Sequence, residues 1–246
     1  MASCHVERPL DDRVWARFSR LQAARPGGFR IAALMRPPDP ETGEDETTWV
    51  ERARTAAAHG PLGHHTHWTS PTHARPTGGD PGERVHREGA WLREQGLRPT
   101  LFCAGGWYMD ESVARAVAEL GYADCTATSF RPTYLDDGAP RLSLDAPGRL
   151  ALRGGGELLE LPTTHSLGMA TRAALSAHSP AEPVVHIYFH DTDLLDRRRA
   201  LALRFALEVL GRRRTATDLD RLAELADGDV PVEDLVVALG ESRPVE

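Results

Sequence analysis

Short apolar runs alternate along this chain with longer amphipathic stretches. Apolar runs of this length predict β-strands, and the amphipathic stretches between them predict helices, which is the pattern of βαβ units. We therefore expect an α/β fold with a parallel sheet or barrel. The strand-like runs cover residues 4–7, 29–35, 60–65, 99–106, 122–128, 158–165 and 184–190.

Some of the expected helices carry recognisable ends. In the stretch 80–96, Asp80 is a predicted N-cap, Pro81 occupies the first helical position, and Gly96 follows the last turn. These signals predict a helix that begins and ends within the stretch. Further helices are expected over residues 110–121, 196–211 and 217–228.

The number and order of these elements limit the architecture. Seven strand-like runs separated mostly by helices fit a TIM-like barrel or a doubly wound sheet. The 246 residues contain no long Gly/Ser linker, charge block or internal repeat, so we expect a single domain over residues 1–246. The stretch 131–156 is rich in Pro, Gly and Asp and predicts a long loop with at most a short hairpin.

Histidines occur where several predicted strands end. His5, His65, His165 and His190 follow or close four different strand-like runs. In both candidate architectures the functional site lies at the carboxyl ends of the strands. We therefore expect these imidazoles to meet at one rim of the sheet or barrel.

The densest group of histidines lies in the sequence HHTHW. Strand alternation places His65 and His67 on one side and His64 on the other, with His73 a further candidate in the following loop. Imidazoles combined with a carboxylate suit zinc and similar divalent ions, and Glu7 is the carboxylate that we select. The alternatives are a polar loop without a metal and a salt bridge between Glu7 and a nearby arginine.

The run HIYFHDTD resembles a buried strand with a polar end. His186, Tyr188 and His190 share one face by the period of two, and we expect His186 to be a core histidine. Asp191 is predicted to orient His190 by accepting its other ring proton. A histidine held in this way can act as a general acid or base near neutral pH.

The stretch LFCAGGWYMD combines a strand end with glycines and aromatic residues. Gly105 permits close approach of the backbone to a ligand, although a tight turn is an equally good explanation. Trp107 and Tyr108 can form a stacking wall for a sugar or another ring. His165 is a further candidate for substrate contact.

Composition narrows the possible functions. All 29 basic residues counted as Lys+Arg are arginines, which excludes a Schiff-base lysine and a P-loop lysine. The formal net charge is −7 with both signs interspersed, so we expect neither nucleic acid nor a membrane as partner. The first residues lack a secretory signal pattern, and three widely spaced cysteines fit reduced thiols in the cytoplasm.

Three motifs resemble the polysaccharide deacetylase family, also known as the NodB homology or carbohydrate esterase 4 family, over nearly the whole chain. They are GHHTHWTSPTH, LFCAGGWYMDESVARAVAELGY and IYFHD, in the order of the family's second, third and fifth motifs. The resemblance implies a distorted (β/α)7 barrel of the NodB type and metal-assisted hydrolysis of an N-acyl group. It also implies that His65 is a metal ligand and that His190 protonates the leaving amine.

This chain departs from the family's pattern in the first, second and third motifs. The first motif, usually Thr-Phe-Asp-Asp-Gly, falls on CHVERP, so that His5 and Glu7 take the places of its aspartates. The second metal-binding histidine has to come from His67 or His73. The arginine of the third motif falls on Cys103, which becomes a candidate for substrate contact. These changes indicate a divergent branch that acts on a small intracellular substrate.

These observations together predict a mechanism. A divalent ion, with zinc the first choice, is held by Glu7, His65 and His67 and activates a water molecule. His5 accepts the water proton, and His190 donates a proton to the amine of a small N-acylated sugar or metabolite. The alternatives are a cyclic-amide hydrolase or amidase, with or without metal, and a protein that binds a sugar or metabolite without turnover. The sequence leaves the oligomeric state open.

Overall fold

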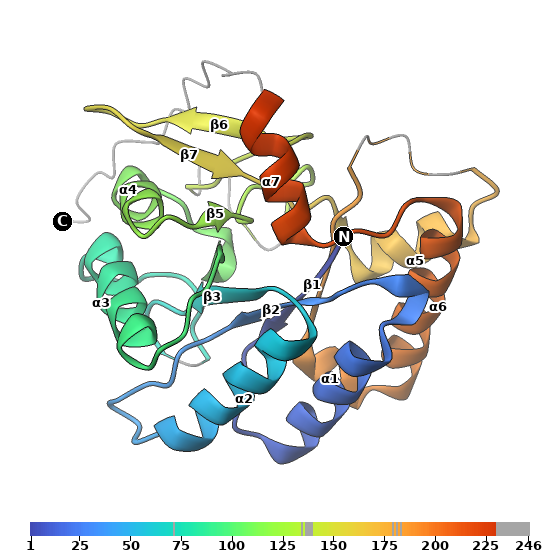
Figure 1. Ribbon diagram of the computed structural model, residues 1–246, viewed down its shortest axis with the longest axis horizontal. Helices are drawn as coiled ribbons and strands as arrows, with labels where there is room; N and C mark the ends of the chain where they lie inside the picture. Colours follow the sequence, from blue (N-terminus) through green and yellow to red (C-terminus); the bar gives the residue numbers. More distant parts are fainter. Residues whose placement is uncertain are drawn as a thin grey trace.

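A curled, mainly parallel sheet forms the centre of the computed structural model, which describes residues 1–70, 72–133, 135, 140–178, 180, 182 and 184–229 (Figure 1). Within these residues the sheet has nine strands in the order β6-β7-β5-β4-β3-β2-β1-β9-β8, and β6 alone runs antiparallel to its neighbour. The expected fold class, a distorted α/β barrel, is confirmed. The strands are β1 (Ala2–Val6), β2 (Ala32–Met35), β3 (Leu62–Thr66), β4 (Leu101–Ala104), β5 (Ala123–Asp124), β6 (Gly148–Ala151), β7 (Glu157–Glu160), β8 (His165–Ser166) and β9 (Ile187–His190).

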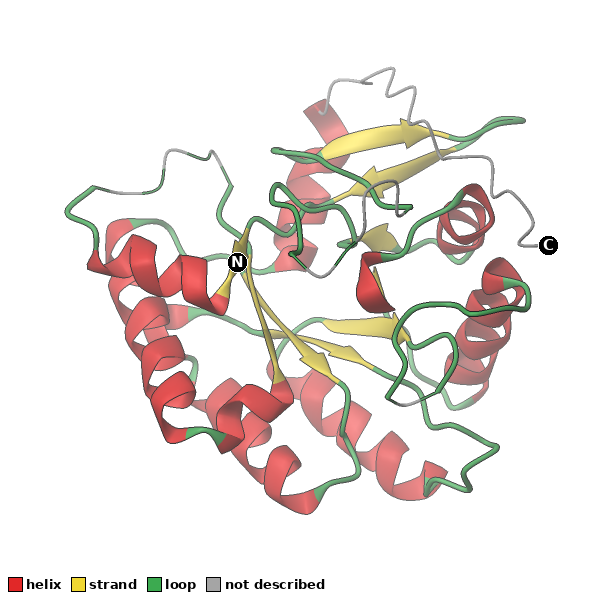
Figure 2. Ribbon diagram, turned by 180° about the vertical axis from the view of Figure 1, so that it is seen from behind, coloured by secondary structure: helices red, strands yellow, loops and turns green. Residues whose placement is uncertain are grey.

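Helices surround the sheet on its outer side (Figures 1 and 2). Side-chain caps fix several of their starting points. In α3, the Asp80 carboxylate accepts the backbone N–H of Glu83 at 3.0 Å, as the sequence predicted. The helices are α1 (Asp12–Ala24), α2 (Glu46–His59), α3 (Pro81–Glu94), α4 (Glu111–Glu119), α5 (Leu167–Leu175), α6 (Arg197–Arg213) and α7 (Leu219–Asp229), with short 3₁₀ segments η1 (Pro26–Gly28), η2 (Gly105–Trp107) and η3 (Asp191–Leu195).

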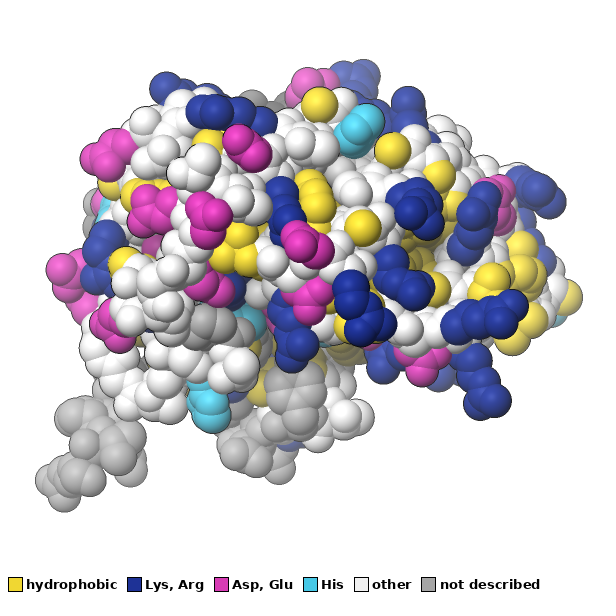
Figure 3. Space-filling view, turned by 90° about the horizontal axis from the view of Figure 1, so that it is seen from below, with side chains coloured by type: hydrophobic (Ala, Val, Ile, Leu, Met, Phe, Trp, Pro, Cys, Tyr) yellow, Lys and Arg dark blue, Asp and Glu magenta, His cyan; other side chains and the backbone are white. Residues whose placement is uncertain are grey.

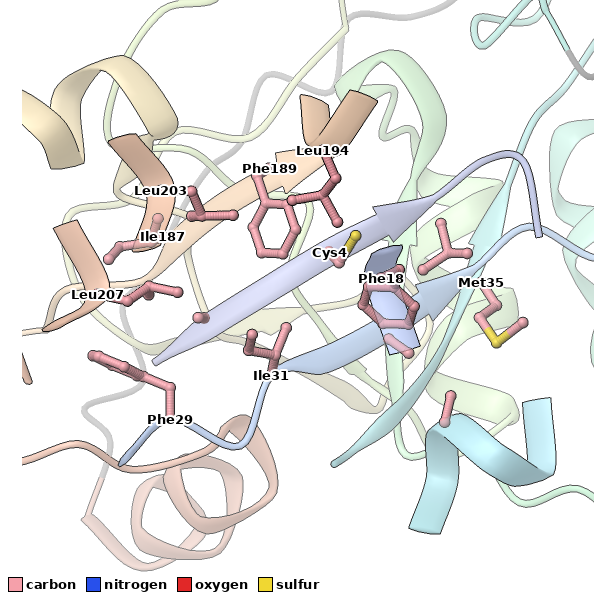
Figure 4. Packing of buried hydrophobic residues seen from close by; sticks show 14 of the residues in the cluster. Cys4, Phe18, Phe29, Ile31, Met35, Ile187, Phe189, Leu194, Leu203 and Leu207 are labelled. Carbon is pink, nitrogen blue, oxygen red and sulfur yellow. The ribbon is translucent and has the colours of Figure 1, made fainter. Parts of the chain in front are cut away.

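The main core lies between the sheet and the helices α1 and α6 (Figure 4). Phe18 of α1 and Leu207 of α6 pack in one cluster with Cys4 of β1 and Phe189 of β9, and all four side chains are buried. Complete burial of such an apolar side chain contributes about 1.5–3 kcal/mol. This packing fixes the outward face of β1 and β9, so the alternate residues of these strands must point into the barrel.

The run at 158–165, which we expected as one strand, is divided between β7 and β8. The Leu161 N–H donates to the Asp124 carbonyl at 2.7 Å, whereas the His165 N–H donates to the His186 carbonyl at 2.9 Å. The chain thus crosses from the β5 side of the sheet to the β9 side within a few residues. This crossing joins the two edges of the curled sheet and explains why a single straight strand does not form.

The loop expected at 131–156 contains β6, which pairs with β7 as an antiparallel hairpin. Its turn uses Gly154, Gly155 and Gly156, which have φ values of 85°, 105° and 92°. Such positive φ values are accessible to glycine at little cost. The short hairpin expected in this stretch is therefore present, with β6 as its first strand.

The outer surface has a groove between α1 and α6, away from the histidine-bearing strand ends. Basic side chains are numerous on one side of the face in Figure 3, although the sequence alone indicates interspersed charges. The groove is lined by Arg17, Arg20, Arg197 and Arg204 together with apolar residues that include Leu21, Leu194 and Leu201.

In the part of the chain that is described, every helix is too short or too polar to cross a membrane.

Candidate functional site

The carboxyl ends of β1, β3, β4 and β9 meet around one pocket. The register pairs His5 of β1 with His190 of β9, and His65 of β3 with Cys103 of β4. The pocket has a volume of about 340 Å³. The expectation that histidines of separate strands meet at one rim is therefore met for three of the four strands. Side chains that line the pocket include those of His5, Glu7, His65, His73, Arg75, Trp107 and His190.

Strand alternation separates the neighbouring histidines of β3 as predicted. His65 and His67 lie on the barrel side with Glu7, and their ligand atoms fall within 4.8 Å of one another. His64 lies on the opposite face, where its Nε2 is 2.8 Å from the Glu88 carboxylate of α3. The period of two thus places two histidines in the pocket and one beneath the helices.

One carboxylate oxygen lies at the centre of the site. Glu7 Oε1 is 3.4 Å from His67 Nε2, 3.5 Å from His190 Nε2 and 4.0 Å from His65 Nε2. Glu7 follows β1 by one residue and lines the same pocket as His5. Among the described residues, Glu7 therefore faces imidazoles and does not form the alternative salt bridge with an arginine.

The spacing of these atoms suits a metal ion. Two nitrogen or oxygen ligands of tetrahedral zinc lie about 3.4 Å apart, given bond lengths of about 2.0–2.1 Å. The Glu7–His67 separation of 3.4 Å matches this value, and the Glu7–His65 separation of 4.0 Å is wider. His65 Nε2 is also buried without a hydrogen-bond partner among the described residues. A buried imidazole nitrogen in this state is suited to a ligand role.

The electrostatics hold the candidate ligands in the protonation states that a metal requires. Burial lowers the pKa of His65 to about 4, although Glu7 opposes this shift. Burial also lowers the pKa of His5 well below its usual range. For Glu7, burial acts to raise the pKa, but the imidazoles of His65, His67 and His190 around its carboxylate outweigh it and lower the pKa far below normal. Near neutral pH these shifts leave His5 and His65 as neutral imidazoles and Glu7 as an ionised carboxylate.

His190 is the most accessible of these imidazoles, with 35% of its side chain exposed. Its predicted orientation by Asp191 is not observed. The buried Asp191 carboxylate instead accepts the backbone N–H groups of Arg8 and Thr192, each at 2.8 Å, and among the described residues it is not bonded to the His190 ring. Asp191 therefore anchors the turn that carries Glu7, and burial raises its own pKa to about 7.

Aromatic side chains form one wall of the site. Trp107 is buried and its ring centroid lies 4.9 Å from that of Tyr188 and 5.4 Å from that of His5. Phe130 stacks on Tyr188 with an interplanar angle of 6°. Trp107 has a φ of 57°, which is rare for a bulky residue and holds the indole against the pocket. Trp107 lines the pocket as expected, whereas Tyr108 does not, and Tyr188 packs against Trp107.

Two other residues expected to contact substrate support the loop instead. A Cβ added at Gly105 would lie 2.5 Å from the Thr66 carbonyl oxygen and 2.8 Å from the Ala74 carbonyl oxygen, so this glycine permits two chain segments to pack closely. The Tyr108 hydroxyl donates to Asp110 at 2.7 Å, outside the pocket lining. Gly105 and Tyr108 therefore position the pocket wall from behind.

The structure places His165 away from the pocket. His165 pairs with Ile187 of β9. Ile187 precedes His190 by three residues, which corresponds to about 10 Å along the strand. Its Nδ1 is 2.9 Å from the Thr164 hydroxyl. The division of the 158–165 run into two strands moves this histidine to the opposite end. His186 is a core histidine as expected, and its Nε2 is 2.8 Å from the buried Ser3 hydroxyl.

The loop after β3 contributes Arg75, which the sequence did not single out, and the candidate His73. Arg75 lines the pocket, and one of its N–H groups donates to the Gly106 carbonyl at 2.7 Å. His73 also lines the pocket, but it is exposed and lies outside the set that Glu7, His65 and His67 form. Between the two candidates for the second histidine ligand, the geometry thus favours His67. The position of Arg75 depends on the fold of this loop and has no signal in the local sequence.

Comparison with known proteins gives information on the fold. No family model matches the chain, and a search of curated protein sequences finds no match. A solved structure of 4-alpha-glucanotransferase from Thermococcus litoralis is similar with a TM-score of 0.50 and 14% identity, over 91% of this chain and 37% of that chain. A candidate polysaccharide deacetylase involved in O-antigen biosynthesis from Bordetella bronchiseptica has a TM-score of 0.47 and 13% identity, over 91% of this chain and 87% of that chain. This chain therefore spans little more than a third of the glucanotransferase, and at such identities the likeness concerns the α/β barrel fold alone.

Proposed function

We propose that this protein is a metal-dependent hydrolase that removes an N-acyl group from a small molecule, as a divergent member of the polysaccharide deacetylase family. The observation that carries the proposal is the Glu7 carboxylate oxygen, which faces the imidazoles of His65, His67 and His190 at the floor of a pocket. The motif resemblance supplies the reaction class, and the geometry supplies the residues.

The donor set fits a borderline divalent ion, with zinc the first choice. Glu7, His65 and His67 would hold it, because their ligand atoms lie within 4.8 Å of one another and two of the three side chains are buried. Such an ion supplies Lewis-acid polarisation of an acyl oxygen and lowers the pKa of water. The backbone carbonyl of Cys103 is 2.8 Å from His65 Nδ1, which leaves Nε2 of that ring directed toward Glu7.

His190 is the proton carrier in this proposal. It stands at the pocket opening with Nε2 3.5 Å from Glu7, and it is the imidazole that solvent and substrate reach. As water adds to the acyl carbon, His190 takes one proton from the water. When the C–N bond breaks, it returns that proton to the leaving nitrogen, so that an amine and a carboxylic acid are produced, and the acid then releases its proton to solvent.

His5 has a different position from that expected of a base. Its ring is buried below His65, with the two centroids 4.5 Å apart, and its Nε2 is 3.5 Å from the Cys103 sulfur. This nitrogen faces the barrel interior, whereas His190 faces the pocket. We therefore assign proton transfer in both directions to His190, and we assign His5 to the support of the ligand set.

The pocket favours a small, ring-containing substrate. Trp107 lines the pocket beside the ligand set and packs against Tyr188, and burial raises the pKa of Tyr188 to about 12, so that its hydroxyl remains neutral. Aromatic faces of this kind stack well on sugar rings. A pocket of about 340 Å³ accommodates a monosaccharide-sized compound. An N-acylated sugar or similar metabolite is therefore the proposed substrate.

The proposal is tested by acyl release from a panel of N-acetylated sugars and small metabolites. Protein is loaded with zinc or cobalt, and acetate is followed by NMR. The substitution His190→Ala is expected to lower turnover roughly 10²- to 10⁴-fold, the usual contribution of a general acid–base group. Metal content should stay near the parental value, because His190 lies outside the ligand set.

The matched control is His59→Ala, because His59 is an exposed histidine in the last turn of α2. This variant should retain parental activity. Parental rates in His190→Ala would contradict its role as proton carrier. Absence of acyl release from every N-acylated compound by loaded protein would refute the deacylase proposal, and a ligand-induced rise in Tm without turnover would then indicate a binding protein.

A further inference from the structure

A second group of potential metal ligands lies directly below the first. His5, His65 and Cys103 each offer one ligand atom, and the three atoms lie within 4.8 Å of one another. Their exposures are 3%, 1% and 0%, so all three side chains are buried, although His5 and His65 also line the pocket. The residues come from β1, β3 and β4, whose backbones are fixed by the sheet.

Cys103 contacts both histidines with different atoms. Its backbone carbonyl accepts the Nδ1–H of His65 at 2.8 Å, and its sulfur is 3.5 Å from Nε2 of His5. The first contact fixes the tautomer of His65 and leaves a lone pair on Nε2, which has no hydrogen-bond partner among the described residues. In the second contact, Nε2 of His5 and the Cys103 sulfur face each other directly.

The separation of sulfur and nitrogen matches that of two ligands on one ion. Zinc bonds of about 2.3 Å to sulfur and about 2.0–2.1 Å to nitrogen place tetrahedral ligands about 3.5 Å apart. The observed distance between Cys103 Sγ and His5 Nε2 is 3.5 Å. An ion can therefore replace the thiol proton between these two atoms with little movement of either side chain.

We propose that His5, His65 and Cys103 form a thiolate-containing position for a divalent ion beneath the Glu7–His65–His67 position. Both positions need the same Nε2 of His65, because its Nδ1 is bonded to the Cys103 carbonyl, so one ion occupies one position at a time. Sulfur ligands favour thiophilic ions, whereas carboxylate and imidazole favour harder ones. Cadmium therefore binds in the lower position, and zinc and cobalt distribute between the two.

The binding step is balanced by one proton. A neutral Cys103 thiol loses its proton to solvent as the metal–sulfur bond forms, and His5 and His65 bind as neutral imidazoles. No oxidation occurs, and no bond of the chain is broken. An ion bound by His5, His65 and Cys103 is not bound by Glu7, so occupation of the lower position removes metal from the Glu7–His65–His67 position. The proposal does not depend on which reaction the pocket catalyses.

The test uses thiolate-to-metal charge transfer, which reports a metal–sulfur bond independently of activity. The full chain is stripped of metal and titrated anaerobically with cadmium or cobalt, in a reductant without a thiol. We expect a charge-transfer band in the ultraviolet that saturates at one equivalent of cadmium. The band should be absent in Cys103→Ser and in Cys103→Ala, and circular dichroism of both variants should confirm the fold.

Cys125→Ser is the matched control. Cys125 is a buried, free cysteine directly after β5, the strand beside β4, and its sulfur belongs to neither ligand group. It should retain the full band. Glu7→Gln should also retain the band, since the lower position does not use Glu7. One bound equivalent without a sulfur band, or a band that persists in folded Cys103 variants, would overturn the inference and leave the proposed hydrolase intact. A sulfur band in protein that hydrolyses no N-acyl compound would support the inference while the hydrolase proposal fails.

Discussion

Two histidine–glutamate contacts lie on opposite faces of β3 and differ in how completely they are closed. On the outer face, Glu88 accepts His64 and the Thr66 hydroxyl at 2.8 Å and the Arg84 guanidinium at 2.8 Å. On the inner face, Glu7 lies 3.4–4.0 Å from the imidazoles around it. The outer contact is a hydrogen-bonded structural network, whereas the inner one has the spacing of ligands around an ion.

The difference shows how the same residue types can serve stability on one face and binding on the other. In the outer network, short hydrogen bonds offset the cost of burying the groups. In the inner group, a buried nitrogen of His65 lacks such a partner among the described residues. The distances between carboxylate and imidazole therefore distinguish the two groups, since Nδ1 of His64 in the outer network also lacks a hydrogen-bond partner among the described residues.

The largest expected effect is on stability, from Glu88→Ala. This change leaves Arg84 and His64 without their carboxylate, and we expect a loss of about 3 kcal/mol in the free energy of unfolding, near the lower end for a broken buried pair. Urea denaturation followed by circular dichroism measures it. Metal affinity of the folded fraction should change little. A large loss of metal affinity with parental stability would show that the outer network serves the site instead.

The complementary change is Glu7→Gln. Loss of the negative charge among the imidazoles should weaken zinc binding roughly 100-fold, which corresponds to about 2.7 kcal/mol. Competition with a chromophoric chelator measures the affinity. Glu88→Gln is the matched control, and it should keep the parental affinity. Equal affinities for Glu7→Gln and the parent would remove Glu7 from the ligand set.

A smaller effect is expected from Gly105→Ala, which tests the packing behind the inner group. The new Cβ would lie 2.5 Å from the Thr66 carbonyl oxygen and 3.1 Å from the His67 ring, so the end of β3 must move. We expect a loss of about 2 kcal/mol in stability, as in other overpacked sites, and weaker metal binding. Gly78→Ala, where nothing lies within 4 Å, is the control. Parental stability and affinity in Gly105→Ala would show that the loop yields freely.

The smallest expected effect is that of mild acid on the inner group. The pKa of His65 is lowered to about 4, so this imidazole stays neutral as the pH falls through the range in which an ordinary histidine is protonated, near pH 6.5. Proton competition at His65 should therefore appear only as the pH approaches about 4. Chelator competition at a series of pH values, compared between the parent and His65→Ala, isolates this contribution. A drop centred near pH 6.5 that disappears in His65→Ala would contradict the shifted pKa.

Local patterns predicted the parts of the site that lie within one strand. The alternation in HHTHW correctly separated His64 from His65 and His67, because a strand turns successive side chains to opposite faces. The sequence left the orientation of His5 open, and the structure places both His5 and Glu7 in the pocket lining. The start of α3 was predicted equally well, since N-capping depends on a few adjacent residues, whereas α6 continues past the expected end at Gly211 to Arg213.

Contacts between distant segments were beyond these patterns. Asp191 follows His190 in sequence, yet it binds the Arg8 backbone, because β1 and β9 are neighbours in the sheet. His165 was expected at the site, but the chain changes strand partner near it and leaves it at the other end. The partner of a carboxylate and the edge of a sheet are set by residues far apart in sequence.

The sequence by itself determined the α/β class, the faces of the strands and the histidines available at their ends, because these follow from periodicity and from local backbone geometry. Only the tertiary structure decided that Glu7 stands among His65, His67 and His190, and that Cys103 lies 3.5 Å from His5. Those distances result from the curvature of the sheet and the order of its strands. Both are products of packing over the whole barrel and are not encoded in any one segment.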